Sequence, residues 1–170
     1  MKKVLIILAI LFLNFAYSQE DLFVKGFKAY ESGNYINAMK YYKKACDLNS
    51  GNGCSNLGFM YANGQGIKKD NFKAVELYQK ACGLEKGLGC FNLGFMYANG
   101  YGVKKDNFKA VELYVKACNL NDGVGCSNLG VMYALGKGVR KDTSKALEYF
   151  GKACDLKDDL GCQAYARLKQ

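Results

Sequence analysis

The chain has 170 residues and a formal net charge of +9, and it contains no histidine, no proline and no tryptophan. Histidine is the commonest metal ligand and the commonest general base, so its absence argues against catalysis that depends on it. Eight cysteines in a chain of this size are typical of proteins that reach an oxidising compartment, where disulfides persist.

The N-terminus has the pattern of a secretory signal. Two lysines precede an apolar run from Val4 to Phe15, and Ala16-Tyr17-Ser18 resembles a cleavage site with small residues. The apolar run is too short for a comfortable transmembrane span, although an uncleaved anchor is the alternative. We therefore predict cleavage of residues 1–18 and export of a mature chain, 19–170, to the periplasm or the medium.

The remaining sequence is a repeat marked by cysteine pairs. The first cysteine of each pair is at 46, 82, 118 or 154 and the second at 54, 90, 126 or 162, so every step is 36 residues. A fixed period of this length is typical of solenoids. We predict one solenoid domain, with units at about 20–48, 49–84, 85–120 and 121–156 and a capping helix over 157–170.

Each unit is predicted to be a pair of helices. In the second unit, apolar and small residues recur at helical spacing from Cys54 to Asn63, and Gly64-Gln65-Gly66 ends that helix. Asp70 caps the second helix, which is expected over Asn71–Leu84. The later units repeat this pattern, with Gly87 and Gly89 predicted to lie in a turn between units.

The two ends of the chain fit the same plan. Leu22–Glu31 and Tyr35–Leu48 are predicted helices of the first unit, whose loop is five residues short when Tyr30 is aligned with Tyr61. Asp158–Lys169 is predicted to be an unpaired last helix with a polar outer face. The total is about nine helices.

The cysteines of each pair lie on either side of a predicted chain reversal. Because identical units need equivalent bridges, we predict local disulfides that join one unit to the next, namely Cys46–Cys54, Cys82–Cys90, Cys118–Cys126 and Cys154–Cys162. Zinc sites favour Cys-x2-Cys pairs or added histidines, and redox motifs favour Cys-x-x-Cys. We therefore predict structural bridges, with no metal and no cofactor.

The repeat resembles the Sel1-like repeat, a relative of the tetratricopeptide repeat. The residues that carry the resemblance are Leu57-Gly58-Phe59-Met60-Tyr61, Gly64-Gln65-Gly66-Ile67, Asp70, Lys73-Ala74, Tyr78 and Lys80-Ala81-Cys82. The cysteine pair in each unit is similar to that of the Helicobacter cysteine-rich protein family. The resemblance implies an all-α fold, a right-handed α/α superhelical solenoid with a concave groove.

The resemblance also implies two functions. The cysteine-rich family is commonly catalogued as β-lactamases or penicillin-binding proteins, whereas Sel1-like proteins in general bind other proteins, including host or cell-envelope partners. No serine after residue 18 has a lysine three positions on, and Lys-Thr-Gly is absent, so the serine β-lactamase motifs are missing. The sequence favours an exported protein that binds a peptide, a peptidoglycan fragment or a β-lactam. Weak β-lactamase activity is the alternative, with no catalytic residue identified.

The binding groove is predicted on the first helix of each pair, which lines the concave side of such a solenoid. Asparagine amides can pair with a peptide or glycan backbone, and phenylalanines offer apolar anchors. The predicted groove residues are Asn56, Phe59, Asn63, Asn92, Phe95, Asn99 and Asn128. Ser55 and Ser127 are also expected to avoid the packed face. The alternative is that the phenylalanines fill space between repeats.

A second pattern is basic. Lys68-Lys69, Lys104-Lys105 and Arg140-Lys141 occupy the same position in three successive loops. They could meet anionic polymers, acidic partners or a membrane surface, but a solvated edge is the simpler expectation. No aromatic–basic motif accompanies them, so nucleic acid is not a predicted partner. The loop tips, Gln65, Tyr101 and Lys137, differ between units, which fits either tuned recognition or drift.

Overall fold

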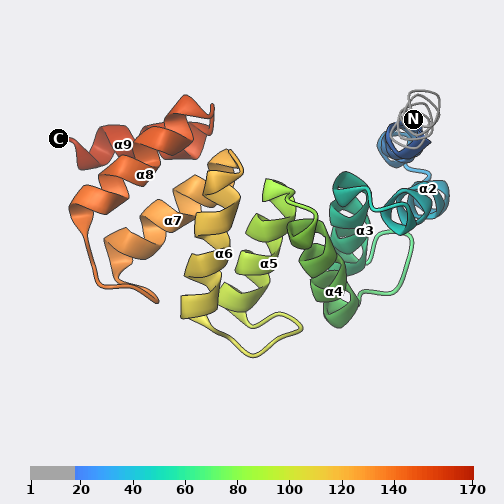
Figure 1. Ribbon diagram of the computed structural model, residues 1–170, viewed down its shortest axis with the longest axis horizontal. Coiled ribbons are helices and arrows are strands. Elements are labelled where there is room, and N and C mark those ends of the chain that lie inside the picture. The colour runs from blue at the N-terminus through green and yellow to red at the C-terminus, as the bar shows by residue number, and fades with distance from the viewer. Residues whose placement is uncertain (1–17) are drawn as a thin grey trace, which may run out of the picture.

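The computed structural model describes residues 18–170, which form nine helices and no strand within that range (Figure 1). Among the described residues, the first helix covers 18–31. It is followed by α2 (Tyr35–Asp47), α3 (Gly51–Asn63), α4 (Asn71–Gly83), α5 (Gly87–Asn99), α6 (Asn107–Asn119), α7 (Gly123–Leu135), α8 (Thr143–Asp155) and α9 (Asp159–Leu168). Each helix packs against the next, and the pairs follow one another from one end of the molecule to the other. The predicted all-α solenoid is confirmed.

The helices divide into an inner and an outer set. The inner helices are the first helix, α3, α5, α7 and α9, and the outer helices are α2, α4, α6 and α8. Besides their sequence neighbours, α3 contacts α5, α5 contacts α7, and α7 contacts α9. Within residues 18–170, no two outer helices make comparable contact. The stack therefore curves with the inner helices on its concave side.

The predicted leader lies outside the described residues, apart from Ser18, which already belongs to the first helix. Among the helices of residues 18–170, none has the length and apolarity that crossing a membrane requires.

The later outer helices begin, and the inner helices end, at the residues that the sequence indicated. The carboxylates of Asp70, Asp106 and Asp142 each accept a hydrogen bond from the backbone N–H three residues on, at 3.0 Å. Such a cap satisfies one of the free N–H groups at a helix start. The inner helices end at Gly64, Gly100 and Gly136 with φ values of 72°, 74° and 67°, a conformation that glycine adopts without strain.

The prediction that Gly87 and Gly89 form a turn is wrong, because both lie in the first turn of α5. A Cβ at Gly89 would lie 2.6 Å from the Cβ of Ala81, and one at Gly87 would lie 2.8 Å from the Cβ of Asp122. The glycines therefore allow close helix packing. The reversal itself lies at residues 84–86, where Glu85 has a φ of 57°. The equivalent glycines of the preceding repeat, Gly51 and Gly53, are likewise helical. Helix α3 therefore begins at Gly51, three residues before the predicted start at Cys54.

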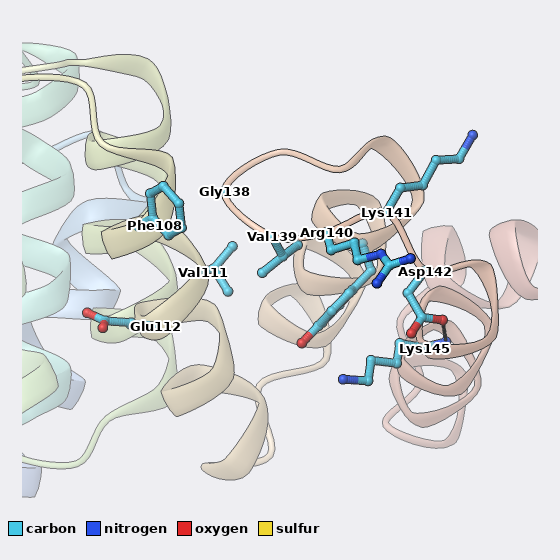
Figure 2. Close-up of a pocket in the computed structure, with 10 residues that line it drawn as sticks. Phe108, Val111, Glu112, Gly138, Val139, Arg140, Lys141, Asp142 and Lys145 are labelled. Carbon is cyan, nitrogen blue, oxygen red and sulfur yellow. Dashed lines mark hydrogen bonds between the residues drawn. The ribbon is translucent and has the colours of Figure 1, made fainter.

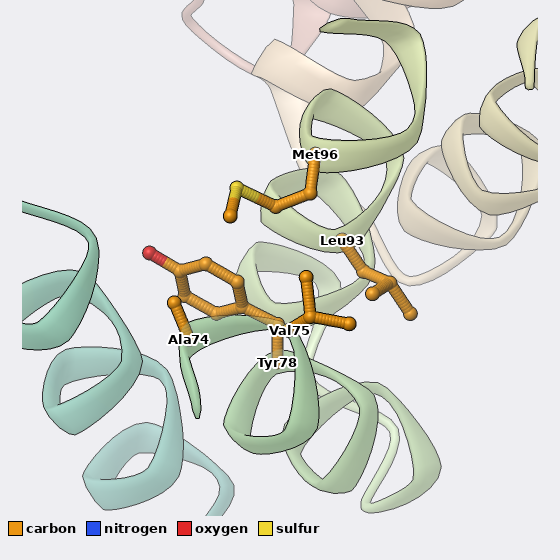
Figure 3. Packing of buried hydrophobic residues seen from close by; sticks show 5 residues of the cluster. All are labelled: Ala74, Val75, Tyr78, Leu93 and Met96. Carbon is orange, nitrogen blue, oxygen red and sulfur yellow. The ribbon is translucent and has the colours of Figure 1, made fainter. Parts of the chain in front are cut away.

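The core is a series of small clusters at the joints between helix pairs. In Figure 3, Ala74, Val75 and Tyr78 of α4 pack with Leu93 and Met96 of α5, and all five side chains are buried. The equivalent residues one repeat later form the next cluster. Burial of a valine- or leucine-sized side chain contributes roughly 1.5–3 kcal/mol, so apolar packing is a main source of stability at each joint.

The four predicted disulfides are confirmed, and the described residues contain no free cysteine. The two Cα atoms of each bridge are 4.4–4.6 Å apart. Each bridge connects the end of an outer helix to the beginning of the next inner helix. The bridges therefore fix the joints that set the curvature of the inner face.

Candidate functional site

The inner face carries one partly exposed apolar side chain per repeat at equivalent positions. These side chains, the apolar ladder, are Phe27, Phe59, Phe95 and Val131, and their exposed fractions are 45%, 42%, 43% and 41%. Each directly follows a glycine whose Cβ would lie within 2.9 Å of a ring on an outer helix. Successive helical residues point about 100° apart. The residue after each contact glycine is thus turned away from the outer helix.

Phe27 was not among the predicted groove residues. The alignment of Tyr30 with Tyr61 placed the first helix one residue out of register. Gly26 and Gly58 are the equivalent residues, because they pack against the equivalent rings of Tyr42 and Tyr78. The loop of the first unit is therefore four residues shorter than the loop of the second unit, not five. A Gly-Phe pair at 26–27, 58–59 and 94–95 was the signal that could have identified Phe27.

The predicted asparagines lie on the inner helices, and four of them bind their own helix. The amides of Asn63 and Asn99 donate to the carbonyls of Phe59 and Phe95, both at 2.9 Å. The amides of Asn56 and Asn128 likewise donate to carbonyls four residues earlier. Each keeps its carbonyl oxygen and one N–H for a ligand, so paired hydrogen bonding to a peptide unit remains chemically open.

One pocket on the inner face brings four predicted residues together. It has a volume of about 210 Å³ between α3 and α5. Phe59 and Asn63 line one side, and Asn92 and Phe95 line the other. The side-chain amide of Asn92 makes no hydrogen bond within residues 18–170, so the whole amide is available to a ligand. The pocket combines apolar walls with a few polar groups, as ligand pockets commonly do.

The loop tips turn toward this face. Tyr101 lines the same pocket, and its ring centroid lies 6.0 Å from that of Phe95. Gln65, at the equivalent tip, accepts a hydrogen bond from the Tyr30 hydroxyl at 2.9 Å. The tips therefore bring different side chains to the groove in different repeats.

The expectation that Ser55 and Ser127 avoid the packed face is wrong. Both residues are buried. The Ser127 hydroxyl donates to the carboxylate of Asp158, which also caps α9 through Gly161 N–H. The neighbouring inner helix covers this position, so neither serine reaches the groove.

The loops after α3, α5 and α7 run along one margin of the solenoid (Figure 1). This loop edge consists of residues 64–70, 100–106 and 136–142 and the first turns of α4, α6 and α8. It has two hollows of about 700 and 670 Å³, with Phe108 and Gly138 lining both. Figure 2 shows the second hollow, with Phe108, Val111 and Glu112 of α6 on one side and Val139, Arg140 and Lys145 on the other.

The described residues contain no cluster of acidic, cysteine or histidine side chains that could hold a metal ion. Tyr78 lines the pocket of the inner face, and burial raises the pKa of its phenol well above the ordinary value. That phenol stays protonated in neutral solution and is a poor anionic nucleophile. The groove as described is chemically suited to binding.

A curved stack of helix pairs with an apolar inner face defines a tetratricopeptide-like solenoid, a class whose concave surface binds other proteins. The chain belongs to the Sel1 repeat family, whose model matches residues 22–50, 51–85, 87–122 and 123–158. The fold thus indicates a function in protein–protein interaction.

Sequence relatives include two Helicobacter pylori proteins, HcpE and HcpC, each named "putative beta-lactamase". HcpE is 54% identical over 43 residues, and HcpC is 44% identical over 50 residues. These segments cover 25% and 29% of this chain but only 12% and 17% of the relatives. The chain thus matches a small part of each relative.

Solved structures of similar fold include the Helicobacter pylori cysteine rich protein B, with a TM-score of 0.63 and 41% identity. That match covers 76% of this chain and 93% of the other. The antigen c5321 of uropathogenic Escherichia coli has a TM-score of 0.79 and 30% identity, over 88% of this chain and 33% of its own. The four disulfides and the cysteine-rich relatives indicate an extracytoplasmic location.

Proposed function

We propose that the concave groove binds an extended peptide segment of a partner protein, from the cell envelope or from a host. The observation that carries this proposal is the apolar ladder, which repeats one side chain per helix pair at nearly constant exposure. An extended peptide presents side chains at regular intervals, so it can contact several repeats at once. A compact ligand would contact one joint only.

The pocket between α3 and α5 supports the same proposal. Phe59 and Phe95 offer apolar walls for one side chain of the peptide, while the free amide of Asn92 can pair with the peptide backbone. Tyr101, which the preceding and following repeats replace with glutamine and lysine, adds a further aromatic ring to this pocket. Aromatic residues are frequent binding hot spots, so this joint is the expected anchor.

The test is selection of phage-displayed 12-residue peptides on the disulfide-intact protein, followed by fluorescence polarisation with the labelled peptides. We expect Phe59→Ala combined with Phe95→Ala to weaken binding at least about tenfold, as loss of hot-spot residues does. The matched control is Phe72→Ala combined with Phe108→Ala, which changes two exposed phenylalanines of the loop edge. Selected peptides that bind both double variants equally, or a selection that yields none, would overturn the proposal.

A second hypothesis is opening of the β-lactam ring, which the names of HcpE and HcpC favour. It is tested with nitrocefin and labelled penicillin on the same protein. Saturable nitrocefin turnover that is lost in the Phe59→Ala, Phe95→Ala variant would support catalysis in the groove and would count against peptide binding as its function. Penicillin binding without turnover, in competition with a selected peptide or a peptidoglycan fragment, would make the β-lactam a ligand of the same pocket.

A further inference from the structure

The loop edge presents a row of apolar side chains that the groove does not use. Phe72 and Phe108 occupy the second position of α4 and α6, and their exposed fractions are 73% and 74%. Ile36, at the equivalent position of α2, extends the row beyond the loop edge and is 72% exposed. Each residue of the apolar ladder is much less exposed. Large apolar side chains that protrude together from a surface mark an interaction site.

Each phenylalanine of this row lies close in sequence to basic residues of its own repeat, and those of Phe108 line a hollow with it. Lys68, Lys69 and Lys73 accompany Phe72, and the residues one repeat later accompany Phe108. The following repeat keeps the cations as Arg140, Lys141 and Lys145. The ion pairs found in residues 18–170, Lys25–Asp21 and Lys43–Asp47, both lie outside the loop edge. The side chains of these nine cations therefore form no ion pair in the described part of the chain.

The structure also holds two of these cations in place. The Nζ atoms of Lys109 and Lys145 lie 4.9 and 5.2 Å from the ring centroids of Tyr97 and Tyr133. Both lysines line the hollows beside Phe108. The carboxylates of Asp106, Asp142 and Glu112 also line the hollows, but the nine cations outnumber them. The edge therefore keeps a positive field around a protruding apolar side chain.

We propose that the loop edge binds the surface of an anionic phospholipid bilayer. Phe72 and Phe108 insert at the boundary between headgroups and acyl chains, and the basic residues contact the lipid phosphates. A solvated edge needs no exposed phenylalanine, and an anionic polymer would engage the cations alone. A bilayer presents a negative plane and an apolar layer directly beneath it, which matches both parts of the pattern.

Vesicle sedimentation tests the electrostatic part of this proposal. We expect binding to vesicles of phosphatidylcholine with about 30% phosphatidylglycerol and none to phosphatidylcholine alone, with binding that weakens as salt rises. Lys104→Gln combined with Lys105→Gln should weaken binding at least about tenfold. Lys40→Gln combined with Lys44→Gln removes the same charge from exposed positions of α2 and should retain most of the binding. Equal losses in the two variants would show that only net charge matters and would overturn a local site.

Insertion of the phenylalanines is tested separately. The chain has no tryptophan, so Phe108→Trp introduces a single reporter whose emission should shift to shorter wavelength with anionic vesicles. Phe95→Trp, on the inner face, should not shift. Phe72→Ser combined with Phe108→Ser should lose binding and still fold, because Ser144 occupies the equivalent position of α8. Unchanged emission and unchanged binding by the serine variant would overturn insertion. Binding of poly-glutamate in place of vesicles would make the edge a docking site for an acidic protein.

Discussion

Tyr42, Tyr78, Tyr114 and Phe150 occupy one buried position of the outer helices, where each ring packs against the contact glycine of an inner helix. Burial raises the pKa of Tyr42 and Tyr114 to about 12, since a phenolate there would lose its hydration. The hydroxyl of Tyr42 is buried without a hydrogen-bond partner. Packing at this position therefore needs the aromatic ring and not the hydroxyl, and α8 has phenylalanine there.

We expect Tyr42→Phe to keep or raise stability at neutral pH, by about 1 kcal/mol, because it removes an unsatisfied buried hydroxyl. The variant should also resist alkali better. The phenol ionises near pH 10 in the unfolded chain and near pH 12 in the folded one, so stability is lost as the pH rises through this window. Urea denaturation at pH 7 and about pH 11 measures both effects, with Tyr41→Phe as the control. Lower stability of Tyr42→Phe at pH 7 would show that the hydroxyl has a stabilising partner.

The helices and bridges could be predicted from the sequence because their signals are local. Asp70 caps a helix through its own neighbours, and a cysteine pair across a short reversal needs no distant information. The roles of Gly87 and Ser127 depend on how closely the next repeat approaches, which a single repeat does not encode. Phe27 was missed because a shorter loop hid its register. The structure brings Phe59 and Phe95 into one pocket, and their part in binding is our proposal.

At the scale of the helices, the contact glycines allow each inner helix to pack closely against an outer helix. A Cβ at Gly94 would lie 2.8 and 2.9 Å from two ring carbons of the buried Tyr114. We expect Gly94→Ala to destabilise the protein by about 1–3 kcal/mol through overpacking, although alanine favours a helix by about 1 kcal/mol. Thermal or urea unfolding measures the change.

The control for this substitution lies at the end of α4. Gly83 is exposed, and a Cβ there would meet nothing within 4 Å. Gly83→Ala should therefore stabilise the protein by about 0.5 kcal/mol, since it restricts the unfolded chain without a clash. If both alanine variants were stabilising, the helices could move apart freely, and the close packing at Gly94 would not be a requirement of the fold.

At the scale of the whole molecule, the solenoid is a row of joints in which each helix contacts only near neighbours. Every joint has the same bridge, with a sequence separation of 8. The first joint is also crossed by Lys80, whose Nζ donates to the carbonyl of Cys46 at 2.7 Å. In such a structure, the position of a joint along the stack determines how many helices are destabilised when that joint is lost.

Removal of a bridge should therefore have a different effect at the end than in the interior. In the chain-entropy model each bridge stabilises the folded state by about 2.5 kcal/mol, and the value is the same for all four because the loops that they close are equally long. Loss of Cys154–Cys162 by alanine substitution should release α9 alone, seen as faster amide exchange in that helix with little change in the main unfolding transition. Loss of Cys82–Cys90 should lower the main transition and weaken peptide binding, since this bridge positions α5 beside α3. Equal effects of the two losses on the main transition would mean that the repeats unfold as one cooperative unit, and that curvature is not set joint by joint.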